Sequence, residues 1–100
     1  MRILVIEDDT DLAQFICKGL KEEGYAVDLA GDGEEGLDFA LANPYDLLIV
    51  DIMLPKLDGL TACRRLRASG NMVPVLLMTA RNTVEDKISG FDTGADQLLP

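Results

Sequence analysis

Hydrophobic residues along the chain fall into short continuous runs, separated by longer segments of mixed polarity. Continuous apolar runs of this kind are typical of strands buried on both faces, as in a parallel sheet. The pattern therefore predicts five strands, the last weaker than the others, at Ile3–Ile6, Ala26–Leu29, Leu47–Val50, Val75–Met78 and Gln97–Leu99.

The segments between these runs have the spacing of amphipathic helices. The first helix is predicted to end before Gly24, which stands in the position of a C-terminal cap. The second is predicted to stop at Asn43 and Pro44, because proline cannot continue a helix. The apolar side of the first helix is predicted to consist of Leu12, Phe15, Ile16, Gly19 and Leu20.

Three further helices are each predicted to begin after a residue whose side chain can cap the first turn. These residues are Asp32, followed by Glu35, then Asp58, and finally Asn82, followed by Glu85. The predicted apolar sides are Leu37, Ala40 and Leu41 in the second helix, Leu60, Cys63 and Leu66 in the third, and Val84, Ile88 and Phe91 in the fourth.

The alternation of strands and helices with short connections favours a parallel sheet covered by helices on both faces. Right-handed crossovers leave few topologies, and the common open order for five strands is 2-1-3-4-5. The expected fold is therefore α/β: a flavodoxin-like, doubly wound, five-stranded parallel sheet in one domain over residues 1–100. In this order, ligands bind in the crevice at the carboxyl ends of the first and third strands.

Composition narrows the classes of function. The chain has 100 residues with Lys+Arg 9 and Asp+Glu 18, which gives a net charge of -9 at pH 7. Nucleic-acid affinity depends on clustered lysine and arginine, so this segment is not expected to contact nucleic acid itself. Cys17 and Cys63 lie in predicted helices and are expected to be packed, reduced thiols. The apolar run after Met1 is too short for a secretion signal or a membrane span, so the expected location is the cytoplasm.

Carboxylates follow two of the predicted strands. Glu7, Asp8 and Asp9 come directly after the first strand, and Asp51 follows the third. Helix capping could explain the first group, and a solvated strand end could explain Asp51. The predicted strand order, however, brings both groups into the same crevice, where their mutual repulsion calls for a cation. Hard oxygen ligands without histidine or cysteine suit Mg²⁺.

A hydroxyl follows the fourth strand. Thr79 comes just after the last apolar residue of that strand, next to the strand of Asp51 in the predicted order. It could donate a hydrogen bond to a phosphoryl oxygen, or it could simply be a threonine with β-propensity that ends a strand.

Four motifs over the whole length of the chain resemble the response-regulator receiver domain of two-component signalling. They are "VIEDD" after the first strand, "DIMLPKLDG" around Asp51, "MTAR" at Thr79 and "GFDTGAD" before the last strand. The sequences "MTAR" and "GFDTGAD" are most similar to those of the subfamily whose receivers precede a winged-helix DNA-binding domain.

The resemblance implies a phosphoacceptor domain rather than a conventional enzyme. Asp51 would take the phosphoryl group from a phosphohistidine, and Mg²⁺ would neutralise charge at that carboxylate. Asp8 would bind the ion directly, Glu7 through water, and Met53 through its backbone carbonyl. The Thr79 hydroxyl and the Ala80 amide would hold the phosphoryl oxygens. Because the chain contains no histidine, the donor would be a sensor histidine kinase or a phosphotransfer protein.

The chain also departs from the family pattern. It stops at Pro100, one residue before the usual lysine, and the last helix of the family fold would be missing. Gln97 and Leu98 stand where the subfamily usually has an aspartate and an aromatic residue. A truncated fold of this kind would leave an apolar patch on the first helix and the sheet, so self-association or exchange of elements between chains is expected.

Three other classes of function are weighed against this one. A phosphatase with an aspartate nucleophile would need a second aspartate at the position of Met53. A flavodoxin-like cofactor binder would need a glycine-rich loop after the first strand, where the carboxylates would repel phosphate. A phosphorylation-independent interaction module with the receiver fold stays as the alternative.

Overall fold

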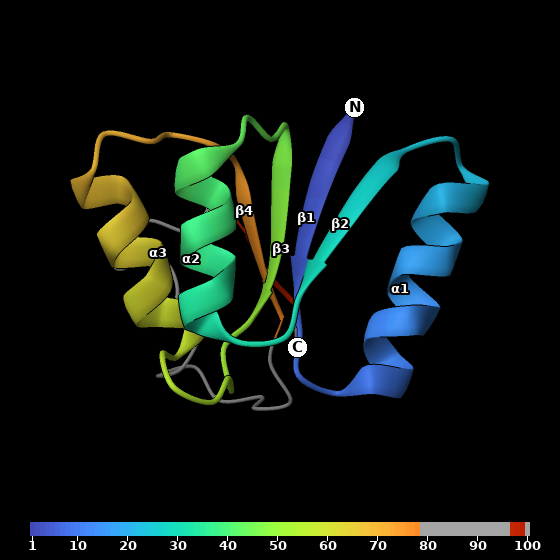
Figure 1. Ribbon diagram of the computed structural model, residues 1–100, viewed down its shortest axis with the longest axis horizontal. Coiled ribbons are helices and arrows are strands. Elements are labelled where there is room, and N and C mark those ends of the chain that lie inside the picture. Colours follow the sequence, from blue (N-terminus) through green and yellow to red (C-terminus); the bar gives the residue numbers. More distant parts are fainter. Residues whose placement is uncertain (79–96, 100) are drawn as a thin grey trace.

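The computed structural model describes residues 1–78 and 97–99. In this part of the chain, strands and helices alternate as the hydrophobic pattern predicts (Figure 1). The predicted fourth helix, with Asn82 at its start, lies outside the described residues. The elements are β1 (Arg2–Ile6), α1 (Thr10–Glu22), β2 (Ala26–Ala30), α2 (Gly33–Ala42), β3 (Leu47–Asp51), α3 (Gly59–Ala68), β4 (Val75–Met78) and β5 (Gln97–Leu99).

The strands form one parallel sheet in the order β2-β1-β3-β4-β5, which confirms the predicted topology. Ile6, the last residue of β1, pairs with Ala30 on one side and with Val50 on the other. Asp51 pairs with Met78 at the end of β4. The carboxyl ends of the central strands are therefore level with one another at one edge of the sheet.

Helices cover both faces of the sheet. In Figure 1, α2 and α3 lie on one face, and α1 lies on the other. Side chains alternate between these faces along each strand, which gives two hydrophobic clusters. The buried cluster under α2 and α3 is Leu4, Ile6, Ala30, Ala40, Leu48, Val50, Ile52, Cys63, Leu66, Val75 and Leu77, and the cluster under α1 is Ile3, Val5, Cys17 and Ile49.

The predicted apolar side of α1 is only partly correct. Ala13 and Cys17 are the buried residues of this helix, whereas Phe15 is 77% exposed and Leu12 is 42% exposed. The reason is that α1 packs against β2 and β1 along a face centred on the two small residues. Leu41 of α2, which was also predicted to face the core, is likewise exposed. The exposure of Phe15 agrees with the expected apolar patch on this helix, and self-association stays a prediction.

The N-caps predicted at Asp32 and Asp58 are confirmed. Asp32 accepts a hydrogen bond from the backbone N–H of Glu35 at 2.9 Å, and Asp58 accepts one from Thr61 at 2.9 Å. Gly24 follows α1 with φ +90°, a conformation that glycine adopts without steric cost. None of the described helices combines the length and the apolar character needed to cross a bilayer.

A polar cluster joins β1, β2 and the segment that precedes β3, away from the end of the sheet where Asp51 lies. Asp28 of β2 accepts hydrogen bonds from the Arg2 guanidinium at 2.7 Å and from the Tyr45 hydroxyl at 2.7 Å. The Arg2 guanidinium also lies 4.9 Å from the centre of the Tyr45 ring. Burial and the Asp28 carboxylate together raise the pKa of Tyr45 to about 12. The Tyr45 hydroxyl therefore stays protonated and donates to Asp28 at neutral pH.

Replacing Tyr45 by phenylalanine is expected to lower the free energy of unfolding by about 1 kcal/mol, because Asp28 loses one donor. Urea denaturation followed by circular dichroism measures this change. Tyr25→Phe is the matched control, because Tyr25 lies on the surface and its replacement should leave the stability nearly unchanged. Equal effects of the two substitutions would show that the bond to Asp28 adds no stability.

Candidate functional site

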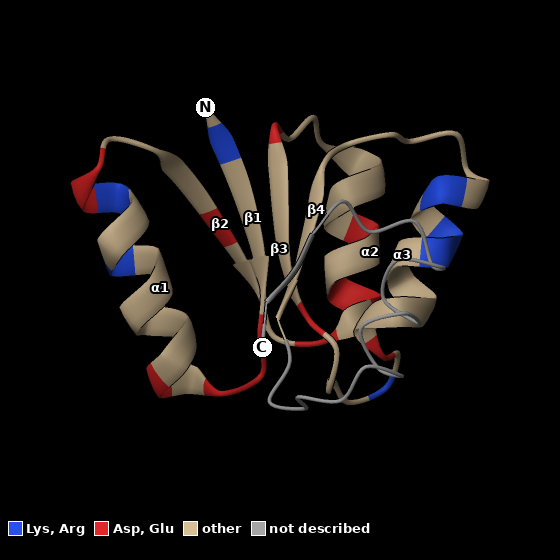
Figure 2. Cartoon of the chain, turned by 180° about the vertical axis from the view of Figure 1, so that it is seen from behind, with Lys and Arg blue, Asp and Glu red and all other residues tan. Residues whose placement is uncertain are grey.

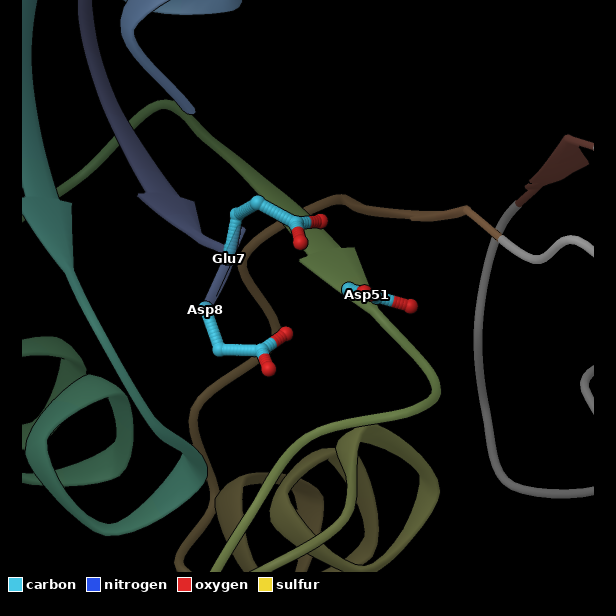
Figure 3. A group of neighbouring side chains, drawn as sticks. All are labelled: Glu7, Asp8 and Asp51. Atoms are coloured by element: carbon cyan, nitrogen blue, oxygen red, sulfur yellow. The ribbon is translucent and has the colours of Figure 1, made fainter. Parts of the chain in front are cut away.

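Three carboxylates meet where β1 and β3 end. One oxygen from each of Glu7, Asp8 and Asp51 lies within 4.8 Å of the other two. Figure 3 shows the Glu7 and Asp8 carboxyl groups turned toward the end of β3, where Asp51 lies. Figure 2 shows acidic positions in the segment that follows β1 and at the end of β3. The structure thus brings together residues that are far apart in the sequence, as the strand order predicts.

Glu7 is the most buried of the three residues, with an exposed fraction of 3%. Its backbone N–H donates to the carbonyl of Ala30 at 3.0 Å, which continues the ladder between β1 and β2 and fixes the start of the side chain. Its Oε1 accepts a hydrogen bond from the Asp9 N–H at 3.0 Å. Its Oε2 is buried and has no hydrogen-bond partner among the described residues. A buried carboxylate oxygen without a partner is an expected site for a bound cation or an ordered water.

Asp9 has a different role from its two neighbours. Its Oδ1 accepts a hydrogen bond from the Leu12 N–H at 3.1 Å, so Asp9 is the N-cap of α1. For this residue, helix capping is the correct interpretation of the acidic sequence. Asp8 is exposed and belongs to the carboxylate cluster.

The electrostatics of the cluster raise the pKa of Glu7 to about 7 from an ordinary value of 4.5. Burial of the carboxyl group is the largest cause, and the negative charges of Asp51 and Asp8 add to it. The hydrogen bond from Asp9 acts in the opposite direction. Glu7, which is buried beside two other carboxylates, therefore holds a proton more tightly than an isolated glutamate does.

Asp51 is half-buried and is oriented by the segment that follows it. Its Oδ1 accepts a hydrogen bond from the Met53 N–H at 2.9 Å. The Met53 side chain is 55% exposed, so Met53 contributes to this end of the sheet mainly through its backbone. Thr79 and Ala80, the residues expected to hold a phosphoryl group, lie outside the described residues.

The donor set fits a hard divalent cation. All three side chains offer carboxylate oxygens, and one of these oxygens is buried without a hydrogen-bond partner in the described part of the chain. Mg²⁺ prefers such oxygen ligands and usually keeps several waters when it binds to proteins. A divalent cation there would also offset the repulsion among the carboxylates.

One ion pair near this site could not be predicted from the sequence. Lys56 Nζ lies 3.5 Å from Asp32 Oδ2, so the segment after Asp51 is joined to the start of α2. An acid and a base far apart in a chain carry no local signal of pairing, and only the tertiary structure brings them together.

A sequence model of the response regulator receiver domain matches residues 3–100. The chain belongs to this family. In a sheet of this strand order, the carboxyl ends of β1 and β3 border the same crevice. The receiver fold therefore explains why the acidic residues after β1 lie close to the aspartate that ends β3.

Two curated relatives of this receiver domain are named Response regulator MprA. The protein of Mycobacterium avium is 45% identical over 100 residues, and that of Mycobacterium tuberculosis is 44% identical over 100 residues. The matches cover 100% of this chain and 44% of each relative. The chain thus spans less than half the length of the curated relatives it matches.

Solved structures agree with the receiver fold. The receiver domain of Francisella response regulator 1452 superposes with a TM-score of 0.94 at 37% identity, over 98% of this chain and 81% of that one. The response regulator TrrA of Thermotoga maritima, solved in complex with Mg(2+)-BeF, gives a TM-score of 0.87 at 33% identity, over 98% of this chain and 84% of that one. These matches confirm the flavodoxin-like parallel sheet.

Proposed function

We propose that this receiver domain is a signalling switch in which Asp51 accepts a phosphoryl group in an Mg²⁺-dependent reaction. The observation that carries the proposal is the meeting of Glu7, Asp8 and Asp51 at the carboxyl end of the sheet. A nucleophilic carboxylate beside a cation site can accept a phosphoryl group, because the cation neutralises charge on the transferring oxygens. The likeness to TrrA, which was solved with Mg(2+)-BeF, supports the same assignment.

In the proposed reaction, an oxygen of Asp51 attacks the phosphorus of a phosphohistidine. The bond from phosphorus to the imidazole nitrogen breaks, and the imidazole leaves with its electron pair. The hydrogen bond from the Met53 N–H orients the Asp51 carboxylate for this attack. Asp8 would bind Mg²⁺ directly, Glu7 through a water molecule and Met53 through its carbonyl oxygen. From the sequence alone, the Thr79 hydroxyl and the Ala80 amide are proposed to donate to the phosphoryl oxygens.

The proposed partners follow from the same chemistry. The chain contains no histidine, so a sensor histidine kinase or a phosphotransfer protein would provide the phosphohistidine. The longer response regulators that the chain matches suggest an output through a further domain, which we propose to be a DNA-binding domain that controls transcription. This segment itself is acidic and is not proposed to contact nucleic acid. Cys17 and Cys63 are buried and form no disulfide, which is compatible with the proposed cytoplasmic location.

Phosphorylation would act by shifting the population between two surface states of the domain, since a ligand or modification favours the state with which it interacts better. Spontaneous hydrolysis of the acyl phosphate would return the domain to its first state.

A titration with Mg²⁺ and then with beryllofluoride, which mimics an aspartyl phosphate, tests the proposal. We expect Mg²⁺ to shift the amide NMR signals of Glu7, Asp8 and Met53, and beryllofluoride to shift Asp51 and Thr79 only when Mg²⁺ is present. Beryllofluoride without Mg²⁺ is the control. Mg²⁺ binding without any response to beryllofluoride would contradict the switch and would favour a phosphorylation-independent interaction module.

A further inference from the structure

The segment between β3 and α3 has a backbone conformation that its own sequence does not favour. It follows Asp51 directly and includes Met53. The Leu57 N–H donates to the Pro55 carbonyl at 2.7 Å, which closes a three-residue turn around Lys56. Lys56 has φ 64°, an uncommon value for a residue with a long side chain. Contacts outside the segment are therefore needed to hold it in place.

The first turn of α2 provides one such contact. Gly33 is the first residue of α2 and is buried against Leu57. A Cβ atom at Gly33 would lie 2.6 Å from the carbonyl carbon of Leu57 and closer still to its oxygen. The two backbones thus touch with no room for a side chain, and Leu57 itself is only 9% exposed. Figure 1 shows the start of α2 and this segment together at the end of the sheet where β3 stops.

Asp32 provides a second contact through one carboxylate group. Its Oδ1 accepts the Glu35 N–H at 2.9 Å as the N-cap of α2. Its Oδ2 lies 3.5 Å from Lys56 Nζ. The Asp32 side chain therefore connects the N-terminus of α2 to the turn around Lys56.

We propose that Gly33 and Asp32 are positioning residues for the metal site, because they fix the segment that begins directly after Asp51 and carries Met53. This inference rests on the proposed function. Mg²⁺ requires nearly ideal octahedral geometry, so a small displacement of this segment weakens binding. Neither residue belongs to the carboxylate cluster. Gly33 acts through its backbone contact with Leu57, and Asp32 acts through its ion pair with Lys56.

The first test compares Mg²⁺ affinity in two alanine variants, measured by amide NMR titration of the full chain. Gly33→Ala is expected to weaken Mg²⁺ binding by about tenfold, because its methyl group displaces Leu57. Gly31→Ala is the matched control in the same connection, since a Cβ atom there meets nothing within 4 Å. Its affinity is expected to equal that of the parent chain. Circular dichroism establishes that each variant is folded before the titration.

The second test replaces Lys56. It distinguishes an effect of the ion pair on the position of the segment from a direct effect of the lysine charge on Mg²⁺ binding. Asparagine tolerates positive φ, so Lys56→Asn keeps the turn and removes the ion pair with Asp32. Loss of a positive charge near carboxylates would by itself strengthen Mg²⁺ binding. Positioning predicts the opposite sign, a weakening by about twofold, since an exposed ion pair contributes little. Lys56→Arg, which can keep the pair, should bind Mg²⁺ as the parent does.

A folded Gly33→Ala chain that binds Mg²⁺ as tightly as the parent would overturn the inference. If Gly33→Ala does not fold, Lys56→Asn decides, and an affinity equal to or above that of the parent would overturn it as well. A parent chain that does not bind Mg²⁺ at all would instead contradict the proposed function itself. The two failures are therefore distinguishable.

Discussion

Asparagine in place of Asp51 is expected to reduce phosphorylation of the chain by more than about a thousandfold, because the attacking carboxylate oxygen is lost. The substitution keeps the shape of the side chain and a carbonyl oxygen that can still accept the Met53 N–H. A loss of reactivity would then reflect chemistry rather than misfolding. Incubation with Mg²⁺ and a small acyl phosphate donor, followed by intact-mass spectrometry, measures the phosphorylated fraction.

Asp38→Asn is the control for this prediction. Asp38 is an exposed carboxylate on α2, outside the carboxylate cluster. Its replacement removes the same negative charge and should leave phosphorylation unchanged. If Asp51→Asn were phosphorylated as readily as the parent chain, the acceptor would have to be another residue, and the assignment of Asp51 would be wrong.

The strands and their order were predictable because their signals are local. The continuous apolar runs of β1 and β3 predict strands buried on both faces, and right-handed crossovers then leave few strand orders. The face that α1 buries was not fully predictable. Residues Leu12, Ala13 and Phe15 lie within one turn of each other, and only the docking of the helix on β2 decides which of them faces the core.

The meeting of Glu7, Asp8 and Asp51 was predictable for a topological reason: parallel strands end at the same edge of the sheet. The individual roles within the acidic sequence were not, because each of three consecutive carboxylates could cap a helix or face the crevice. The structure gives the capping role to Asp9 and the buried position to Glu7. The backbone contact between Gly33 and Leu57 likewise depends on tertiary packing and leaves no local trace in the sequence.

Repulsion within the carboxylate cluster is expected to lower the stability of the folded domain, as is common where function requires clustered charges. Glu7 is the residue in which this cost is concentrated, since it is buried and its pKa is raised to about 7. The folded chain binds the Glu7 proton more tightly than the unfolded chain, where the pKa is near 4.5. The stability linked to this proton is therefore fully present below pH 4.5 and is lost as the pH rises through about 7.

Replacing Glu7 by glutamine is expected to raise the free energy of unfolding by about 2–3 kcal/mol at pH 8 without Mg²⁺, because a neutral side chain removes the charge penalty. The gain should largely disappear at pH 4.5, where glutamate in the unfolded chain begins to take up its proton. Glutamine can still accept the Asp9 N–H through its amide oxygen. Urea denaturation at both pH values, in the presence of a chelator, measures the difference.

Glu22→Gln is the control, because Glu22 lies on the surface at the end of α1 and its replacement should change stability by less than about 0.5 kcal/mol at either pH. Addition of Mg²⁺ provides an independent check that the charge of the buried Glu7 carboxylate lowers the stability. The ion should stabilise the parent chain at pH 8, since it binds only the folded form, and should stabilise Glu7→Gln less. A Glu7→Gln chain that is no more stable than the parent at pH 8 would show that the buried carboxylate carries no penalty, and that the repulsion among Glu7, Asp8 and Asp51 is relieved without a cation.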